Sequence, residues 1–119
     1  MGILLVLLIT FVPALCAAQP KLTWQDVFKK ASDWMWDCYK EQALTALKTN
    51  MDADTFAKVL PVACSKQIHY TVIAEYNLAI ERGHHENATR EEITKSMTEA
   101  LESVQRLYVK QLKEQRSKH

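Results

Sequence analysis

Two cysteines, Cys38 and Cys64, lie at equal distances along the chain from Met51, thirteen residues before it and thirteen after it. The segment around Met51, Asn-Met-Asp-Ala-Asp at 50–54, supplies the Asn and Asp residues that favour turns and helix N-caps. Two antiparallel helices that leave one turn place equidistant residues side by side, and a disulfide requires Cα atoms about 5.5 Å apart. The spacing therefore predicts a helical hairpin stapled by one disulfide between Cys38 and Cys64.

The N-terminal residues 1–18 have the layout of a secretory signal peptide. An apolar run from Ile3 to Val12 is followed by Pro13 and then by small residues, which predicts cleavage after Ala18. The alternative is an uncleaved membrane anchor, which is disfavoured because a spanning helix needs roughly 20 apolar residues. We therefore expect a single secreted helical domain over 19–119, with an extracellular location.

Cleavage would also remove Cys16, which leaves Cys38 and Cys64 as an even pair. Disulfides form and persist in the oxidising compartments that a secreted chain meets. One intramolecular bond is the expected outcome. The alternatives are two buried free thiols or a disulfide between two chains.

The scarcity of helix-breaking residues predicts an all-α fold. After residue 18 the chain has one glycine, Gly83, and two prolines, Pro20 and Pro61. Helix-favouring Ala, Leu, Lys, Glu and Gln are abundant. We expect a small bundle of three main helices, over 24–49, from about residue 53 to 82, and from 89 onward, with the second helix kinked or broken near Pro61.

Two helix starts carry capping signals. Thr23 precedes the first helix with Asp26 three residues on, and Thr89 precedes the last with Glu92 three residues on. The last helix then shows apolar and neutral residues at alternating spacings of four and three, typical of a helix packed on one face. Those residues are Ile93, Met97, Ala100, Val104, Leu107 and Gln111.

Helical periodicity divides the large side chains of the first helix between two faces. Counting about 100° per residue places Trp34 with Met35 and Cys38 on the predicted core face, and Trp36 outside it. Trp36 belongs to a second apolar strip, the candidate partner surface, formed by Trp36, Lys40, Ala43, Leu44 and Leu47. The plainer interpretation is that the last helix, or Met51 and the turn, covers this strip. The candidate functional interpretation is a surface for a partner protein or for self-association, and a third is one wall of a ligand cavity.

Asn87 begins the triplet Asn-Ala-Thr, which matches the N-glycosylation sequon. The preceding segment is polar and contains Gly83, which predicts an exposed loop. In a chain that enters a eukaryotic secretory pathway, we expect Asn87 to carry a glycan.

The sequence offers little chemistry for catalysis. It has no Gly-rich phosphate loop, no His-Glu-x-x-His motif and no nucleophile elbow, so we expect no enzyme, no cofactor and no metal site. His84, His85 and Glu86 are adjacent, and adjacent loop residues rarely face one ion. Glu75 lies close to an apolar stripe, where a carboxylate must find a partner or keep its proton.

Charge and size narrow the functional classes. Fifteen Lys and Arg residues balance fourteen Asp and Glu residues, which argues against a nucleic-acid partner. Near-neutral charge and well-capped helices also argue against stable membrane insertion. We expect a non-enzymatic secreted protein that acts by extracellular protein–protein interaction as a ligand, effector or component of a secreted fluid. The alternative is a carrier of small lipophilic molecules in a cavity of the bundle, because the helices contain many bulky residues.

Overall fold

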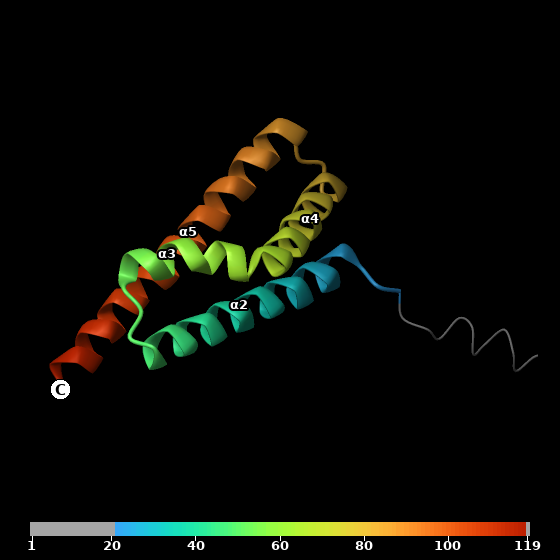
Figure 1. Ribbon diagram of the computed structural model, residues 1–119. Helices are drawn as coiled ribbons and strands as arrows, with labels where there is room; N and C mark the ends of the chain where they lie inside the picture. The colour runs from blue at the N-terminus through green and yellow to red at the C-terminus, as the bar shows by residue number, and fades with distance from the viewer. Residues whose placement is uncertain (1–20, 119) are drawn as a thin grey trace, which may run out of the picture.

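The chain folds into a bundle of α-helices, seen in a computed structural model that describes residues 21–118 (Figure 1). The helices are α2 (Trp24–Lys48), α3 (Ala53–Ala63), α4 (Ser65–Glu81) and α5 (Glu86–Ser117). The predicted all-α class is confirmed, but the described residues form four helices where three main helices were expected. The signal peptide, its cleavage site and Cys16 lie outside the described residues. No helix within 21–118 is both long and apolar enough to cross a membrane.

Helix α2 begins where its capping residues predict. The Thr23 side chain accepts a hydrogen bond from the backbone N–H of Asp26, and the Asp26 carboxylate accepts in return from the Thr23 backbone N–H. The Thr23 hydroxyl also donates to the same carboxylate over 2.8 Å. These hydrogen bonds lower the pKa of Asp26 because they favour its charged form. The predicted capping box is therefore confirmed.

The chain reverses direction between α2 and α3 around Asn50. Asn50 has a φ angle of 54°, in the left-handed region that Asn tolerates better than most residues. The backbone N–H of Met51 donates to the carbonyl of Ala46 over 2.9 Å, which closes the end of α2. This turn returns α3 and α4 along α2 in the antiparallel direction (Figure 1).

The disulfide forms where the equal spacing predicts. The sulfur atoms of Cys38 and Cys64 are bonded, and their Cα atoms are 5.9 Å apart. Both cysteines are buried, and Cys64 has no exposed surface. The bond therefore fastens the middle of α2 to the junction of α3 and α4.

The second predicted helix breaks at Cys64, three residues after Pro61. Pro61 lies inside α3, where its ring removes one backbone donor. Cys64 then leaves helical geometry, with φ −104° and ψ 16°. Backbone hydrogen bonds still run from Cys64 N–H to Leu60 and from Ile68 N–H to Cys64. The junction is therefore a bend with a nearly continuous backbone ladder, and it redirects α4 away from the axis of α3.

Helix α5 begins earlier than the sequence predicts. His85 is the N-cap, and its Nδ1 accepts a hydrogen bond from the backbone N–H of Asn87 over 3.3 Å. Thr89, the predicted cap, is buried inside the first turns, and its hydroxyl donates to the carbonyl of His85. Asn87 is exposed as predicted, but it lies in the first turn of α5 and not in a loop.

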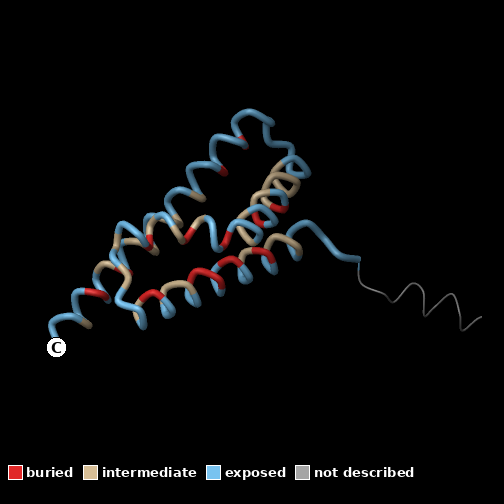
Figure 2. The backbone as a smooth tube through the Cα atoms, in the orientation of Figure 1, coloured by how far each residue is buried: buried red, intermediate tan, exposed pale blue. Residues whose placement is uncertain are grey.

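The core lies between α2, α3 and the C-terminal half of α5, and buried residues follow one side of α2 (Figure 2). Tyr39 and Tyr108 are each only 1 % exposed, as is Phe56 of α3. The assignment of Trp34 to the core face was wrong: Trp34 is 42 % exposed, slightly more than Trp36 at 38 %. Trp34 lies at the margin of the fold, where its ring packs against Tyr70 of α4 at a centroid distance of 5.8 Å, and the core cluster contains Met35, Cys38 and Tyr39.

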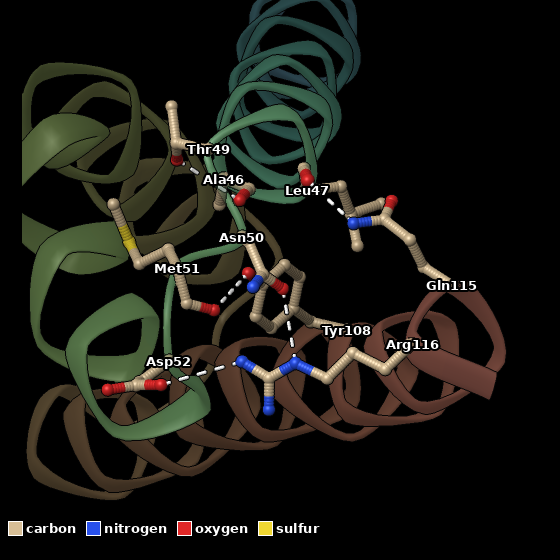
Figure 3. A network of polar contacts seen from close by, with 9 residues as sticks. All are labelled: Ala46, Leu47, Thr49, Asn50, Met51, Asp52, Tyr108, Gln115 and Arg116. Carbon is tan, nitrogen blue, oxygen red and sulfur yellow. Dashed lines mark hydrogen bonds and ion pairs between the residues drawn. The ribbon is translucent and has the colours of Figure 1, made fainter. Parts of the chain in front are cut away.

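The C-terminal part of α5 is fixed to the turn between α2 and α3 (Figure 3). The Tyr108 hydroxyl donates to the carbonyl of Met51 over 2.6 Å, and the Gln115 amide donates to the carbonyl of Leu47 over 2.9 Å. The Arg116 guanidinium donates to the Asn50 side chain over 3.1 Å. These contacts join α5 to the last turn of α2 and to the segment that follows it, and they set the position of α5 relative to α2.

Candidate functional site

An apolar groove runs between α2 and α5, and it contains most of the surface that the sequence singled out. Its volume is about 460 Å³. The residues on the α2 side are Trp36, Tyr39, Lys40, Ala43 and Leu44. The residues on the α5 side are Val104, Leu107, Tyr108 and Gln111. We call this feature the α2–α5 groove.

The groove has a rigid base and an exposed apolar edge. Tyr39 and Tyr108 are buried, and the Trp36 ring meets the Tyr39 ring edge-to-face, with centroids 5.4 Å apart and planes at 89°. Leu44 is 60 % exposed and Leu107 is 55 % exposed, one on each helix. Large aliphatic side chains this open to water are candidates for contact with another molecule when they gather around one depression.

Four of the five residues of the candidate partner surface line the groove: Trp36, Lys40, Ala43 and Leu44. Leu47 does not, because it is half-buried and packs against the core cluster. Helix α5 forms the opposite wall, and the strip is partly covered: Ala43 and Leu47 are half-buried, while Trp36 and Leu44 remain exposed.

Sequence reasoning missed the α5 wall as part of the site. The alternating pattern of α5 contained Val104, Leu107 and Gln111, but it did not reveal which helix they would face. The sequence also did not indicate Tyr39 as part of the site. Tyr39 and Tyr108 are the most buried side chains of the groove. Burial raises the pKa of the Tyr39 phenol to about 12, and within residues 21–118 its hydroxyl has no hydrogen-bond partner.

A second hollow lies between α4 and α5, but its polar groups are engaged locally. It has a volume of about 520 Å³ and includes Asn77, Arg90 and Thr94. The Asn77 amide donates to the Ile73 carbonyl, the Thr94 hydroxyl donates to the Arg90 carbonyl, and Arg90 pairs with Glu86 at 2.9 Å. These bonds leave few free groups to select a ligand.

Two carboxylates meet in a smaller cavity near the start of α5. Glu75 of α4 and Glu92 of α5 both line it, together with Phe28 of α2, in a volume of about 220 Å³. One oxygen of Glu75 is buried without a hydrogen-bond partner among the described residues. Burial, and next the negative charge of Glu92, raise the pKa of the Glu75 carboxyl. The pairing of Glu75 with a cation, which the sequence suggested, is not seen within residues 21–118.

The raised pKa of Glu75 predicts a pH-dependent stability. The folded protein holds this proton more tightly than the unfolded chain, so stability falls as the pH rises from about 4.5 through the folded pKa. Glu75→Gln should therefore raise the free energy of unfolding at pH 7.5 by up to about 1 kcal/mol, because it removes a partly buried charge, and should have little effect at pH 3.5. Urea unfolding at both values measures this, with the exposed Glu99→Gln as control. An equal increase in the free energy of unfolding at pH 7.5 and pH 3.5 would contradict the prediction.

No metal-ligating cluster of three or more His, Cys, Asp or Glu side chains occurs in the part of the chain that the structure describes. Comparison with known proteins gave no match to a family model, a curated protein or a solved structure. Proposals about function therefore rest on the residues and geometry of this chain.

Proposed function

We propose that this protein is a secreted, non-enzymatic helical protein that acts through extracellular protein–protein interaction, and that the α2–α5 groove is its contact surface. The observation that supports this most directly is the exposure of Trp36, Leu44 and Leu107 around one apolar depression. Aromatic anchors in such depressions carry much of the binding energy at protein interfaces. Lys40 and Gln111 supply the polar rim that such interfaces usually have.

Secretion is part of the proposal and agrees with three features. The N-terminal segment reads as a signal peptide. The buried Cys38–Cys64 bond suits an oxidising compartment. Asn87 is exposed and available to carry the glycan that the sequon predicts. The absence of catalytic motifs in the sequence supports a non-enzymatic role.

A second candidate function, a carrier of small lipophilic molecules, is favoured by the volume of the groove. Ligand pockets typically occupy about 300–1,000 Å³ and are lined mainly by apolar and aromatic side chains. The α2–α5 groove falls within this range at about 460 Å³ and contains three aromatic rings, those of Trp36, Tyr39 and Tyr108.

The interaction proposal predicts that two substitutions in the groove remove binding without unfolding the protein. In the double variant Trp36→Ala/Leu44→Ser, we expect self-association or binding to a partner protein to weaken by about 30-fold or more, as for an interface hot spot. Leu44 is 60 % exposed and Trp36 loses mainly its edge contact with Tyr39, so the helical circular dichroism spectrum should be unchanged and the loss of unfolding free energy should stay below about 2 kcal/mol.

Sedimentation velocity measures self-association, and saturable binding of labelled protein to cells measures the interaction with a receptor. The protein should be collected from the medium of eukaryotic cells, where its intact mass reports the N-terminus and any glycan. Trp34→Ala is the matched control, because Trp34 is equally exposed but lies outside the groove against Tyr70 of α4. Equal losses of binding in both variants, or unfolding of the double variant, would refute the proposed surface.

A further inference from the structure

The lining of the α2–α5 groove is chemically selective. Of its nine lining residues, Lys40 carries the only formal charge, and Gln111 provides the only amide. Both side chains are exposed, and neither forms a side-chain hydrogen bond or ion pair with another residue in 21–118. The phenol of Tyr108 is already committed to the Met51 carbonyl. The Tyr39 hydroxyl has no hydrogen-bond partner within 21–118, but it is buried. The exposed polar groups of the groove are therefore the ammonium group of Lys40, which is the one charge of the lining, and the amide of Gln111, which can donate and accept.

We infer that the α2–α5 groove binds a single-chain amphipathic anion, with its apolar chain on Trp36, Leu44 and Leu107 and its carboxylate at Lys40. Charge complementarity supports this occupant, because the lining contains no acidic residue to oppose a negative head group. The inference deepens the carrier function. It shares with the interaction proposal the premise that the groove is a binding site, but it requires no protein partner.

The dimensions of the groove fit one chain better than a bilayer surface. Its volume of about 460 Å³ equals that of roughly 15 water molecules at 30 Å³ each, which suits a single extended lipid acid. Tyr39 and Tyr108 close its base, and α2 and α5 form two walls, so a ligand meets protein on three sides. The outer side of the groove is open to water, so one alkyl chain would be buried along its inner side.

Titration with carboxylates of increasing chain length tests whether the alkyl chain binds along the apolar lining of the groove. Octanoate, decanoate and dodecanoate, each used below its micelle concentration, should bind with one-to-one stoichiometry in isothermal titration calorimetry. Each additional buried methylene should tighten binding by up to about fourfold, since burial of one CH₂ changes the binding constant by that factor. Trp36 lines the groove, so its fluorescence in the variant Trp24→Phe/Trp34→Phe should change over the same concentration range.

Changing the head group of the ligand, and substituting Lys40, test whether the carboxylate binds at Lys40. Dodecylamine should bind at least tenfold more weakly than dodecanoate, because its ammonium group meets Lys40. Lys40→Gln should weaken dodecanoate binding by about three- to tenfold and reduce the preference over the amine, as expected for a partly exposed ion pair. Lys58→Gln is the matched control, because Lys58 is an exposed lysine of α3 outside the groove. Ala43→Phe, which fills the groove, should weaken binding of both ligands.

Any one of the following results would overturn the inference: dodecylamine binds as tightly as dodecanoate, Lys40→Gln and Lys58→Gln weaken dodecanoate binding equally, or no carboxylate binds below about 1 mM. Binding only to vesicles that contain phosphatidylserine would also overturn it, and would assign the face to a membrane surface. These titrations use no partner protein, so their failure and the failure of the interaction proposal can be told apart.

Discussion

Replacing both Cys38 and Cys64 by alanine is expected to lower the free energy of unfolding by about 3 kcal/mol or more. The bond joins residues 26 positions apart, and closing a loop of that length restricts the unfolded chain by an amount that corresponds to roughly 3 kcal/mol. Removing two buried sulfur atoms adds a packing loss, because Cys64 is completely buried and Cys38 nearly so. Folded proteins of this size have a free energy of unfolding of about 5–15 kcal/mol, so such a loss is a large share of the total stability.

Urea unfolding followed by circular dichroism measures this effect in the variant, the oxidised protein and the reduced protein. The reduced protein keeps both sulfur atoms, so the difference in free energy of unfolding between the oxidised and reduced forms measures the effect of the crosslink alone. The further loss in the double alanine variant reports the packing. A double variant that unfolds at the same urea concentration as the oxidised protein would show that the hairpin does not depend on this bond.

The hairpin could be predicted because its determinants are local or symmetric along the chain. Thr23 and Asp26 are three residues apart, and their capping box depends on no other element. Cys38 and Cys64 could be paired because the turn at 50–54 marks the centre between them. Knowledge of one turn was enough to place two distant residues in contact.

The sequence did not predict correctly which face of α2 is buried in the core. Helical periodicity orders Trp34, Trp36 and Tyr39 around the axis, but it does not state which direction other helices will cover. Helix α4 packs along the edge of α2 that carries Trp34, which lies at the margin against Tyr70, while Tyr39 enters the core. The choice of face depends on where the disulfide and the bend at Cys64 direct α4.

The N-cap of α5 could not be predicted from the capping pattern alone. Thr89 with Glu92 satisfies the sequence pattern of a capping box, yet His85 caps the helix four residues earlier. The earlier cap adds backbone hydrogen bonds, including Thr89 N–H to the His85 carbonyl over 2.9 Å. It also buries the Thr89 side chain, which is 2 % exposed. Local patterns identify residues able to cap, and packing decides which one does.

The sequence could not predict that α5 forms a wall of the groove, because the contacts that position α5 join residues far apart in the chain. Tyr108 reaches Met51 across 57 positions, and Gln115 reaches Leu47 across 68. No spacing rule connects these residues, so the sequence offered one strip on α2 without the wall that makes it a groove.

The second large effect is expected at Tyr108, which joins α5 to α3 and to the turn. Its ring lies 4.0 Å from the ring of Phe56, centroid to centroid, and its hydroxyl donates to the Met51 carbonyl. Tyr108→Ala removes both contacts from a fully packed position, so it should cost about 3–5 kcal/mol. Tyr108→Phe keeps the ring and loses one hydrogen bond, so it should cost about 1 kcal/mol.

The neighbouring Leu107→Ala is the matched control for Tyr108→Ala. Leu107 precedes Tyr108 on α5 but is 55 % exposed, so its truncation should cost less than about 1 kcal/mol. Hydrogen exchange should separate the two elements: in Tyr108→Ala the amides of α5 should lose protection first, while α2, α3 and α4 remain protected by the disulfide-linked hairpin. Equal losses of stability in Tyr108→Ala and Leu107→Ala would show that α5 is not anchored at Tyr108. The position of α5 would then depend on the contacts of Gln115 and Arg116 with the end of α2 and the turn.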